Sequence, residues 1–441
     1  MPIPPSSCGY LLRPTCLAIA LAVAATGAAR HGEADPGRRI GGGNIPVRGD
    51  KAKLEALKAI EAGMCRVPVD ARAYWDGRAA TPEKADAAVL MAHRYGITPM
   101  LLFEYYTRWH GELGGYDKWR AIGRAFAERF RPDSGWLKSK GIRGWGVTFY
   151  SAINEPMWKS NNPTPIPPAQ YARAMEGLAD GVHSVGAKLR VSPGGYQEVP
   201  LFQRRNPYIQ AVAPLYRNGK LHAVDIHRYW DVKYVPMQKG RAHSLQSQFD
   251  MVKKWLGLPD SVRFYTTEMN FKKRLVTEEQ AAEGLLTALW DALTVVGDDG
   301  KVVTEFVLPW NLFNLAAKDT HYGMCTKLDP WTPTARGKVI RMVCRLTGGM
   351  EIVSTDPRKT GVTVLAGAGR KLWVWQNRKG WSSLHGKAFH IDGVPDTATQ
   401  LHVYAWNGLL RTVPLNGRTS LILRDLLPGQ TYMFLAKPAA P

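Results

Sequence analysis

The feature that most constrains the fold of this chain is a repeated pairing of an apolar, β-prone run with an amphipathic helical stretch. The apolar runs begin near residues 40, 64, 98, 146, 188, 223, 262 and 305. Their mean spacing of about 38 residues is that of a strand followed by a helix. Eight such units predict an α/β fold, a (β/α)8 TIM barrel. A doubly wound open sheet is the alternative, because periodicity alone does not show closure.

The pattern changes near Thr347 from helical periodicity to strand-like alternation. Alternating runs cover residues 361–365, 371–376, 400–405, 420–423 and 431–435. The pairs Asn407-Gly408 and Asn416-Gly417 have the turn chemistry expected of hairpins. We therefore predict a barrel over residues 30–346 and a small C-terminal antiparallel β-sandwich over residues 347–441.

Two interpretations of the C-terminal module are open at this point. It either packs against the barrel as a structural unit or offers its tryptophans as a sugar-binding face. Those tryptophans are Trp373, Trp375, Trp381 and Trp406.

The first 29 residues have the pattern of a secretory signal peptide. Arg13 precedes an apolar run from Leu17 to Ala25, and the small residues Gly27, Ala28 and Ala29 follow. The run is too short for a comfortable membrane span. We expect residues 1–29 to be removed and the mature protein to be secreted or periplasmic, with no stable membrane span.

The chain is strongly basic, with 58 Lys and Arg against 37 Asp and Glu and a formal net charge of +21. Such a charge suits either a solvated surface or attraction to a polyanion, so that an anionic polysaccharide is the first choice among charged partners. Nucleic acid is not expected, because the basic residues are dispersed and no recognition motif accompanies them.

No cofactor and no metal are predicted. The glycines at 41–43 lack the GxGxxG spacing of a dinucleotide site, and the cysteines beyond the leader, Cys65, Cys325 and Cys344, lack metal-ligand spacing. In an oxidising compartment Cys325 and Cys344 are candidates for a disulfide bond. Cys65 is then expected to be a buried thiol within a strand.

Two glutamates end the predicted fourth and seventh strands. Glu155 follows Asn154 and precedes Pro156, and Glu268 follows Thr267. In an eight-stranded barrel these strand ends face each other across the mouth. Two facing carboxyl groups, one protonated and one ionised, are what glycoside hydrolysis requires. Glu104, after the third strand, is a rival acid without the Asn-Glu-Pro context.

These motifs resemble those of clan A glycoside hydrolases, of family 39 or family 5, over about residues 38–345. The resemblance implies a retaining O-glycosidase that cleaves a polysaccharide or oligosaccharide by double displacement, and the leader-like residues 1–29 add that it is secreted. It implies that Glu155 is the acid/base and Glu268 the nucleophile. It also implies substrate-binding or supporting roles for Asn154, Arg66, His227, Tyr229 and Trp310. Trp158 and Trp109 are expected to be further stacking platforms for sugar rings.

Other functions remain as alternatives. An inactive barrel that binds polysaccharide is suggested by the 15 tryptophans and the all-β tail. A metal-dependent hydrolase would need clustered ligands at strand ends, and no His-x-His occurs among the 11 histidines. The sharpest expectation is a distance, because retaining enzymes hold their carboxyl groups about 5 to 5.5 Å apart and inverting enzymes hold them farther apart. The sequence leaves open the sugar, the linkage, endo or exo action and the oligomeric state.

Overall fold

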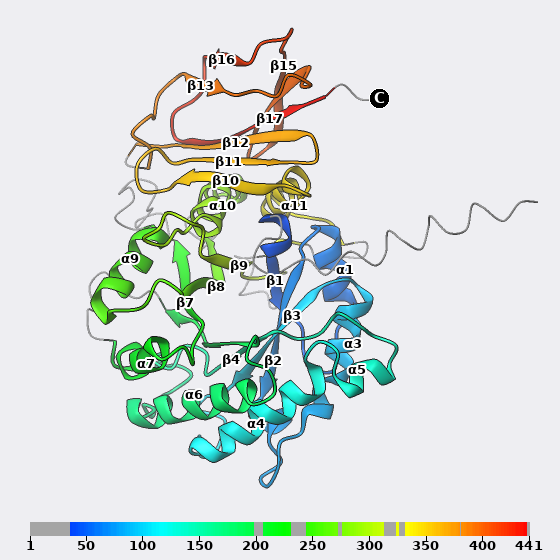
Figure 1. Cartoon of the computed structure of the whole chain (residues 1–441), viewed down its shortest axis with the longest axis vertical. Coiled ribbons are helices and arrows are strands. Elements are labelled where there is room, and N and C mark those ends of the chain that lie inside the picture. The colour runs from blue at the N-terminus through cyan, green and yellow to red at the C-terminus, as the bar shows by residue number, and fades with distance from the viewer. Residues whose placement is uncertain are drawn as a thin grey trace, which may run out of the picture.

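A computed structural model of the chain describes residues 36–197, 206–230, 244–271, 276–312, 323–325, 331–379 and 381–438. Over these residues a barrel of parallel strands is followed by a module of antiparallel strands (Figure 1). The predicted signal peptide, residues 1–29, lies outside the described residues. Within the described ranges, no helix is both long and apolar enough to cross a bilayer.

The barrel has eight strands, of which the fifth is interrupted. β1 to β5 form one parallel sheet and β6 to β9 form another, and β5 and β6 are the two parts of the fifth strand. A parallel bridge between Ile40 and Val307 joins the two ends, so the sheet closes into a barrel. The strands are β1 Gly41–Asn44, β2 Met64–Asp70, β3 Thr98–Glu104, β4 Phe149–Ala152, β5 Arg190–Pro193, β6 Tyr196–Gln197, β7 Ala223–Trp230, β8 Arg263–Phe271 and β9 Thr304–Pro309.

The first strand is made largely of glycine. Arg38 and Arg39 belong to a short 3-10 helix, η1 Pro36–Arg39, and the glycines at 41–43 form β1 itself. A Cβ on Gly41 would lie 2.4 Å from the carbonyl oxygen of Met64 and 2.3 Å from the side chain of Leu308. Only glycine allows β1 to lie this close to its neighbours on both sides.

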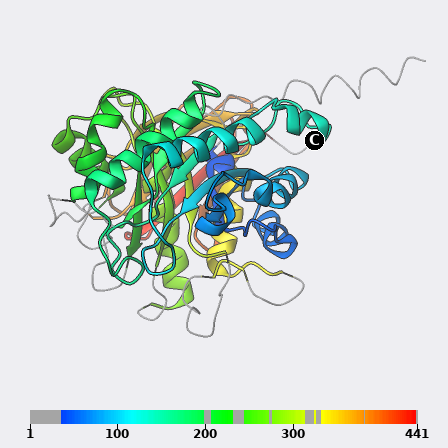
Figure 2. The same ribbon diagram turned by 90° about the horizontal axis from the view of Figure 1, so that it is seen from below.

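Helices lie around the strands (Figure 2). They follow the strands as the repeat predicts: α4 spans Tyr116–Phe130, and α10, Glu278–Leu293, begins with a capping box formed by Thr277 and Gln280. The others are α1 Lys51–Ala59, α2 Ala71–Tyr74, η2 Pro82–Ala85, α3 Asp86–Arg94, α5 Gly135–Ser139, α6 Pro168–His183, α7 Pro207–Arg217, α9 Leu245–Leu256 and α11 Ala335–Thr347.

A layer of large apolar side chains fills the interior of the barrel. Phe149, Tyr265 and Phe306 pack ring against ring at its centre, with centroids 4.0 to 6.0 Å apart. The whole layer consists of Met64, Met100, Phe149, Ala223, Tyr265, Phe306 and Leu308. Because successive residues of a strand point to opposite faces, the inward residues that follow along these strands rise from this layer toward the barrel mouth.

The C-terminal module contains a six-stranded antiparallel sheet and a separate pair of strands, β13 and β16. A hairpin connects β14 to β15 as predicted, with Trp406 and Asn407 in the turn and Gly408 as the first residue of β15. Asn416 and Gly417 do not form a hairpin, because β16 pairs with β13 instead of β15. The strands are β10 Glu351–Asp356, β11 Val362–Gly367, β12 Arg370–Asn377, β13 Phe389–Asp392, β14 Gln400–Ala405, β15 Gly408–Pro414, β16 Ser420–Leu423 and β17 Gln430–Lys437.

One face of the large sheet packs on the barrel, next to α10 and α11 (Figure 1). Leu372, Val374 and Met433 belong to the same buried apolar cluster as the barrel helices. The guanidinium of Arg378 donates to Glu283 and to the hydroxyl of Thr287 on α10. These contacts support the structural interpretation of the module.

The tryptophans of the module do not form an open sugar-binding face. Trp373, Trp375 and Trp381 are buried, and Trp406 is partly buried against the main apolar cluster. Their side chains contribute to packing, so the interpretation of these four residues as a sugar-binding surface is wrong.

The suggested disulfide is absent. Cys65, Cys325 and Cys344 are all buried free thiols. The thiol of Cys325 donates to the carbonyl of Ala56, and that of Cys344 donates to the carbonyl of Gly37, each at 3.7 Å. Cys65 lies within β2 as expected, and burial raises its pKa to about 12.

Candidate active site

The predicted polar residues gather at the carboxyl ends of the barrel strands. Asp225, His227 and Tyr229 alternate along β7, so all three side chains share its inward face. They continue the column that begins with Ala223 in the apolar layer. The sequence pattern therefore places one acid, one imidazole and one phenol in line at increasing height in the barrel.

A bulge in β8 turns Glu268 toward the same space. The pairing of β8 with β7 shifts by one residue between Tyr265 and Met269, and the pairing with β9 shifts in the same stretch. An extra residue of this kind re-aims side chains. Thr267 and Glu268 are adjacent in sequence, yet both contact Arg66 inside the barrel mouth.

Glu155 has an unusual backbone conformation that neighbouring residues hold in place. Its φ of 45° lies in the left-handed region, which is costly for a residue with a side chain and recurs at functional sites. Its N–H donates to the carbonyl of Gly195 at 3.0 Å, and its carbonyl accepts from the N–H of Trp158 and the side-chain amide of Asn162. The surrounding loops therefore impose this conformation.

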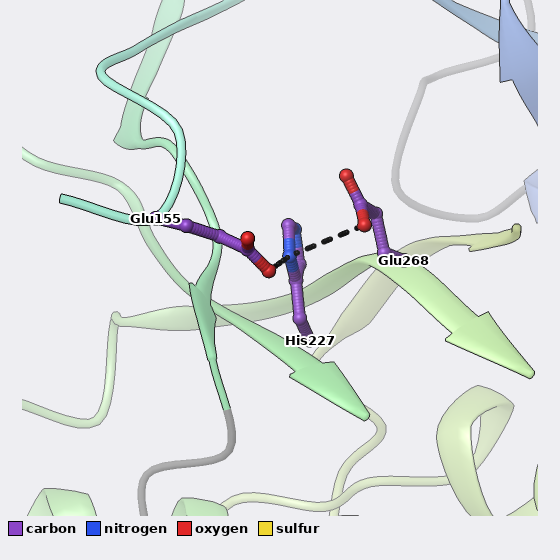
Figure 3. A group of neighbouring side chains, drawn as sticks. All are labelled: Glu155, His227 and Glu268. Atoms are coloured by element: carbon purple, nitrogen blue, oxygen red, sulfur yellow. Dashed lines mark hydrogen bonds and ion pairs between the residues drawn. The ribbon is translucent and has the colours of Figure 1, made fainter. Parts of the chain in front are cut away.

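The two glutamates approach His227 from either side (Figure 3). Nδ1 of His227 lies 2.7 Å from Oε1 of Glu155 and 3.6 Å from Oε2 of Glu268. One atom from each of the three side chains lies within 4.8 Å of the others. The carboxyl groups are thus close enough to act on one small group held between them.

The pKa values of the two carboxyl groups are shifted in opposite directions. Burial raises the pKa of Glu155, and the charge of Glu268 adds to this effect against the opposing influence of His227. Burial also disfavours ionised Glu268, but the charges of His227 and Arg66 and the hydrogen bonds from Tyr229 and Arg66 outweigh it and lower the pKa of Glu268. The site therefore favours a protonated Glu155 beside an ionised Glu268.

Both oxygens of Glu268 have a donor. Arg66 donates to Oε1 at 2.5 Å and the hydroxyl of Tyr229 donates to Oε2 at 2.6 Å. Arg66 is itself buried and is held by Asn44, whose side-chain oxygen accepts from its Nε at 2.7 Å. A second nitrogen of the guanidinium lies 3.4 Å from the side-chain oxygen of Asn154. The predicted residues thus form one connected network.

The three predicted tryptophans lie in two different environments. Trp310 follows β9, and its ring lies 5.4 Å from the guanidinium of Arg66, so it borders the carboxyl pair. Trp109 and Trp158 are 57% and 43% exposed and stand on the loops after β3 and β4. Arg108 joins these loops by donating to the carbonyls of Asn161 and Ser160.

Several residues of the site were not predicted. Asp225 accepts from both the backbone N–H and the hydroxyl of Thr267. Gln197, on β6, donates to Oε2 of Glu155 at 3.4 Å. Glu104, by contrast, was named from the sequence as a rival acid; it lies near Arg66, and burial raises its pKa to about 7. The alternation of β7 already pointed Asp225 inward, but the short strand β6 carries no pattern from which Gln197 is predictable.

A cation could use the oxygen and nitrogen atoms of Glu155, His227 and Glu268, which are grouped closely enough for ligands. The Glu268 oxygens, however, already accept from Arg66 and Tyr229. The guanidinium also places a positive charge where a metal ion would bring a second one. This donor set fits proton transfer better than metal ligation.

No protein-family model and no curated protein matches the sequence of this chain. Among solved structures, a glucosidase from Croceicoccus marinus has a TM-score of 0.63 and 12% identity, covering 93% of this chain and 98% of its own. A family 39 glycoside hydrolase from Bacteroides cellulosilyticus has a TM-score of 0.58 and 14% identity, covering 92% and 82%. A family 51 α-L-arabinofuranosidase from Bifidobacterium longum has a TM-score of 0.57 and 12% identity, covering 92% and 96%. The chain therefore has the fold of the clan A glycosidases that its motifs resemble.

Proposed function

We propose that this protein is a retaining glycoside hydrolase with Glu155 as acid/base and Glu268 as nucleophile. The observation that carries the proposal is the carboxyl pair formed by Glu155 just after β4 and Glu268 within β8, with atoms within 4.8 Å of each other and opposite pKa shifts. Retaining enzymes hold their carboxyl groups about 5 to 5.5 Å apart, whereas inverting enzymes leave about 6.5 to 9.5 Å for a water.

The reaction proceeds in two displacements. In the first, Glu268 attacks the anomeric carbon while Glu155 gives its proton to the departing oxygen. This breaks the glycosidic bond and leaves the sugar bound to Glu268 as an ester. In the second, Glu155 takes a proton from water, the water oxygen attacks the same carbon, and Glu268 leaves as a carboxylate.

The supporting residues have roles that follow from their contacts. Arg66 and Tyr229 keep Glu268 ionised and oriented for attack. Asn154 places a polar side chain beside this pair, where a sugar hydroxyl would lie. Trp310 offers an apolar face next to Arg66 for the reacting ring.

The substrate we propose is a polysaccharide or oligosaccharide. The structural neighbours include a glucosidase, an α-L-arabinofuranosidase and a β-xylosidase, so the fold does not select one sugar. The net charge of +21 supports an anionic polymer as one substrate to test. Cleavage of neutral and acidic polysaccharides at two salt concentrations would show whether the charge contributes to binding.

A covalent label and two variants test the assignment. The protein is first screened on 4-nitrophenyl glycosides of xylose, glucose and arabinofuranose and on polysaccharides. A 2-deoxy-2-fluoro analogue of the sugar cleaved should then attach to Glu268, as located by mass spectrometry of peptides. Glu268→Gln and Glu155→Gln should each lower turnover by about 10³-fold or more.

The same experiment separates the competing functions. A chelator should leave cleavage unchanged, and chelator-sensitive activity would favour a metal-dependent hydrolase instead. Binding of glycans without release of products would favour a polysaccharide-binding protein. Labelling of another residue, or normal turnover in both variants, would contradict the two-glutamate mechanism.

We also propose that the protein is exported. The support is the leader-like pattern of residues 1–29, with Arg13 ahead of the apolar run. Expression of the full chain in a secreting host and mass analysis of the mature N-terminus test this. A cytoplasmic product that retains Met1 would contradict it.

A further inference from the structure

The hydroxyl of Thr267 has all of its hydrogen-bonding positions occupied. It lies 2.6 Å from Oδ2 of Asp225, 2.9 Å from Nε2 of His227 and 3.3 Å from a guanidinium nitrogen of Arg66. A hydroxyl has one proton to donate and two lone pairs to accept with. Arg66 can only donate, so one of the two lone pairs is taken by its N–H.

The remaining two contacts are fixed by Asp225. Its Oδ1 accepts the backbone N–H of Thr267 at 2.9 Å, so its carboxylate already acts as an acceptor toward this residue. Burial raises the pKa of Asp225, while the charges of His227 and Arg66 and the two hydrogen bonds from Thr267 favour its ionised form. In that form the carboxylate has no proton to give, so the hydroxyl of Thr267 donates to Oδ2. The second lone pair must then accept from Nε2 of His227, which therefore carries a hydrogen.

We propose that Asp225 and Thr267 are positioning residues that keep a proton on Nε2 of His227 and so direct Nδ1 to share a proton with Glu155. This inference rests on the proposed function, in which Glu155 must arrive protonated. The chain of contacts runs from Asp225 through Thr267 and His227 to Oε1 of Glu155, and every link is buried. Asp225 itself does not touch the reacting atoms.

The proton shared between Nδ1 and Glu155 depends on every charged group around the imidazole. Glu155 approaches from the end of β4, Glu268 from β8 and Asp225 from β7, and Arg66 from β2 contacts Thr267. Burial lowers the pKa of His227, but the negative charges of Glu268, Glu155 and Asp225 together raise it. The proton between Nδ1 and Oε1 of Glu155 is therefore shared by two groups whose pKa values are both raised.

The substitution Asp225→Asn should reverse the direction of the hydrogen bonds that run from residue 225 through Thr267 to His227. Its side-chain oxygen would keep the backbone N–H of Thr267, and its NH₂ would point at the Thr267 hydroxyl and donate to it. The hydroxyl must then donate to Nε2 of His227, which becomes an acceptor. The single ring proton moves to Nδ1 and is donated to Glu155, which favours the ionised carboxylate and lowers its pKa.

A spectrum reports this reversal without any substrate. In protein labelled with ¹⁵N-histidine, the Nε2 signal of His227 is assigned by its loss in His227→Gln. We expect a protonated Nε2 in the wild type and in Thr267→Ser, and an unprotonated Nε2 in Asp225→Asn. An unprotonated Nε2 in the wild type, or a signal unchanged in Asp225→Asn, would overturn the proposal.

The effect of Asp225→Asn on proton donation by Glu155 can be measured as kcat/KM on glycosides with two different leaving groups. With phenyl glycosides, which need a proton on the leaving oxygen, kcat/KM of Asp225→Asn should fall on the order of 10²-fold. With 2,4-dinitrophenyl glycosides of the same sugar the loss should be roughly tenfold or less. The basic limb of the pH profile should move to lower pH, because ionised Glu155 cannot donate.

Matched variants separate this role from folding. Thr267→Val removes the hydroxyl that links Asp225 to His227 and should lower activity as Asp225→Asn does. Thr267→Ser keeps a hydroxyl at this position and should retain activity. Thr304→Val removes a buried strand hydroxyl far from the site and should keep the wild-type profile. Equal losses with both leaving groups, or an unmoved basic limb, would overturn the role; a wild type that cleaves no glycoside would contradict the proposed function and leave the spectrum to decide the relay.

Discussion

Gly195 lies so close to His227 that a Cβ on the glycine would be 1.8 Å from Nε2 of the imidazole. Gly195 interrupts the fifth strand between β5 and β6, and its carbonyl accepts the backbone N–H of Glu155. One glycine therefore provides the space for the histidine and holds the backbone of the glutamate that the histidine contacts.

The substitution Gly195→Ala should displace His227 from Glu155 and lower kcat/KM by on the order of 10²-fold, since small displacements in a site have effects of this size. The assay is cleavage of an aryl glycoside, with the melting temperature measured in parallel. Gly135→Ala is the control, because a Cβ there meets nothing within 4 Å. Normal turnover in a folded Gly195→Ala protein would show that the imidazole is free to move without consequence.

The position of Glu155 could be predicted because the end of β4 is visible in the sequence as an apolar run followed by Asn-Glu-Pro. Glu268 was predicted to end its strand, but β8 continues to Phe271 and Glu268 lies at the bulge within it. The contacts that the two glutamates make could not be predicted from the sequence. The bulge at Thr267 and Glu268 depends on how β8 pairs with both neighbours, and the space at Gly195 depends on a histidine from another strand. Both are tertiary features without a local signal.

The C-terminal module shows the same limit. The runs of β11, β12, β14 and β17 were predicted, since each carries several buried apolar residues. β10 and β15 were not, and they are the two edges of the six-stranded sheet. Most of their residues are exposed or only partly buried. A strand without a buried face has no alternation to detect.

Arg66 should set the acid limb of the pH profile. The pKa of Glu268 lies below its ordinary value, so cleavage is present above that pKa and is lost as the pH falls through it. Arg66→Met removes a charge and a hydrogen bond while burial continues to favour the protonated acid. The pKa of Glu268 therefore rises, and the acid limb of kcat/KM should move up by about 1 to 3 pH units.

The control for this profile is Arg124→Met, which removes an exposed arginine that pairs with Glu128 on α4. Its acid limb should match that of the wild type. Because loss of a buried charge partner also destabilises the fold, the profiles are recorded well below the melting temperature of each variant. An unmoved acid limb in Arg66→Met would mean that Arg66 does not control the ionisation of Glu268.

Trp109 and Trp158 should contribute to binding of long substrates and not to the chemical step. Each exposed ring offers a stacking face worth about 0.5 to 1.5 kcal/mol, which corresponds to roughly a two- to tenfold change in affinity. Alanine variants should raise KM for an oligosaccharide by this factor and leave kcat on an aryl monosaccharide unchanged. Leu427→Ala, at an exposed apolar residue of the C-terminal module, is the matched control. An equal loss on both substrates would place these rings at the reacting sugar.

The C-terminal module should unfold together with the barrel. Met433 of β17 lies in the same apolar cluster as the barrel helices, and the hydroxyl of Thr431 contacts that of Thr287 on α10 at 2.7 Å. Met433→Ala should destabilise the whole protein by about 2 to 5 kcal/mol. Calorimetry should still show a single transition, at a lower temperature, and loss of glycosidase activity should follow it.

Leu410→Ala is the control for this substitution, because Leu410 is an exposed residue of the edge strand β15. It should leave the melting temperature almost unchanged. The physical reason for joint unfolding is that removing the sheet exposes the apolar face of α10, which packs against β8, the strand that carries Glu268. Two separate transitions in Met433→Ala, with activity retained after the first, would show instead that the barrel stands without the module.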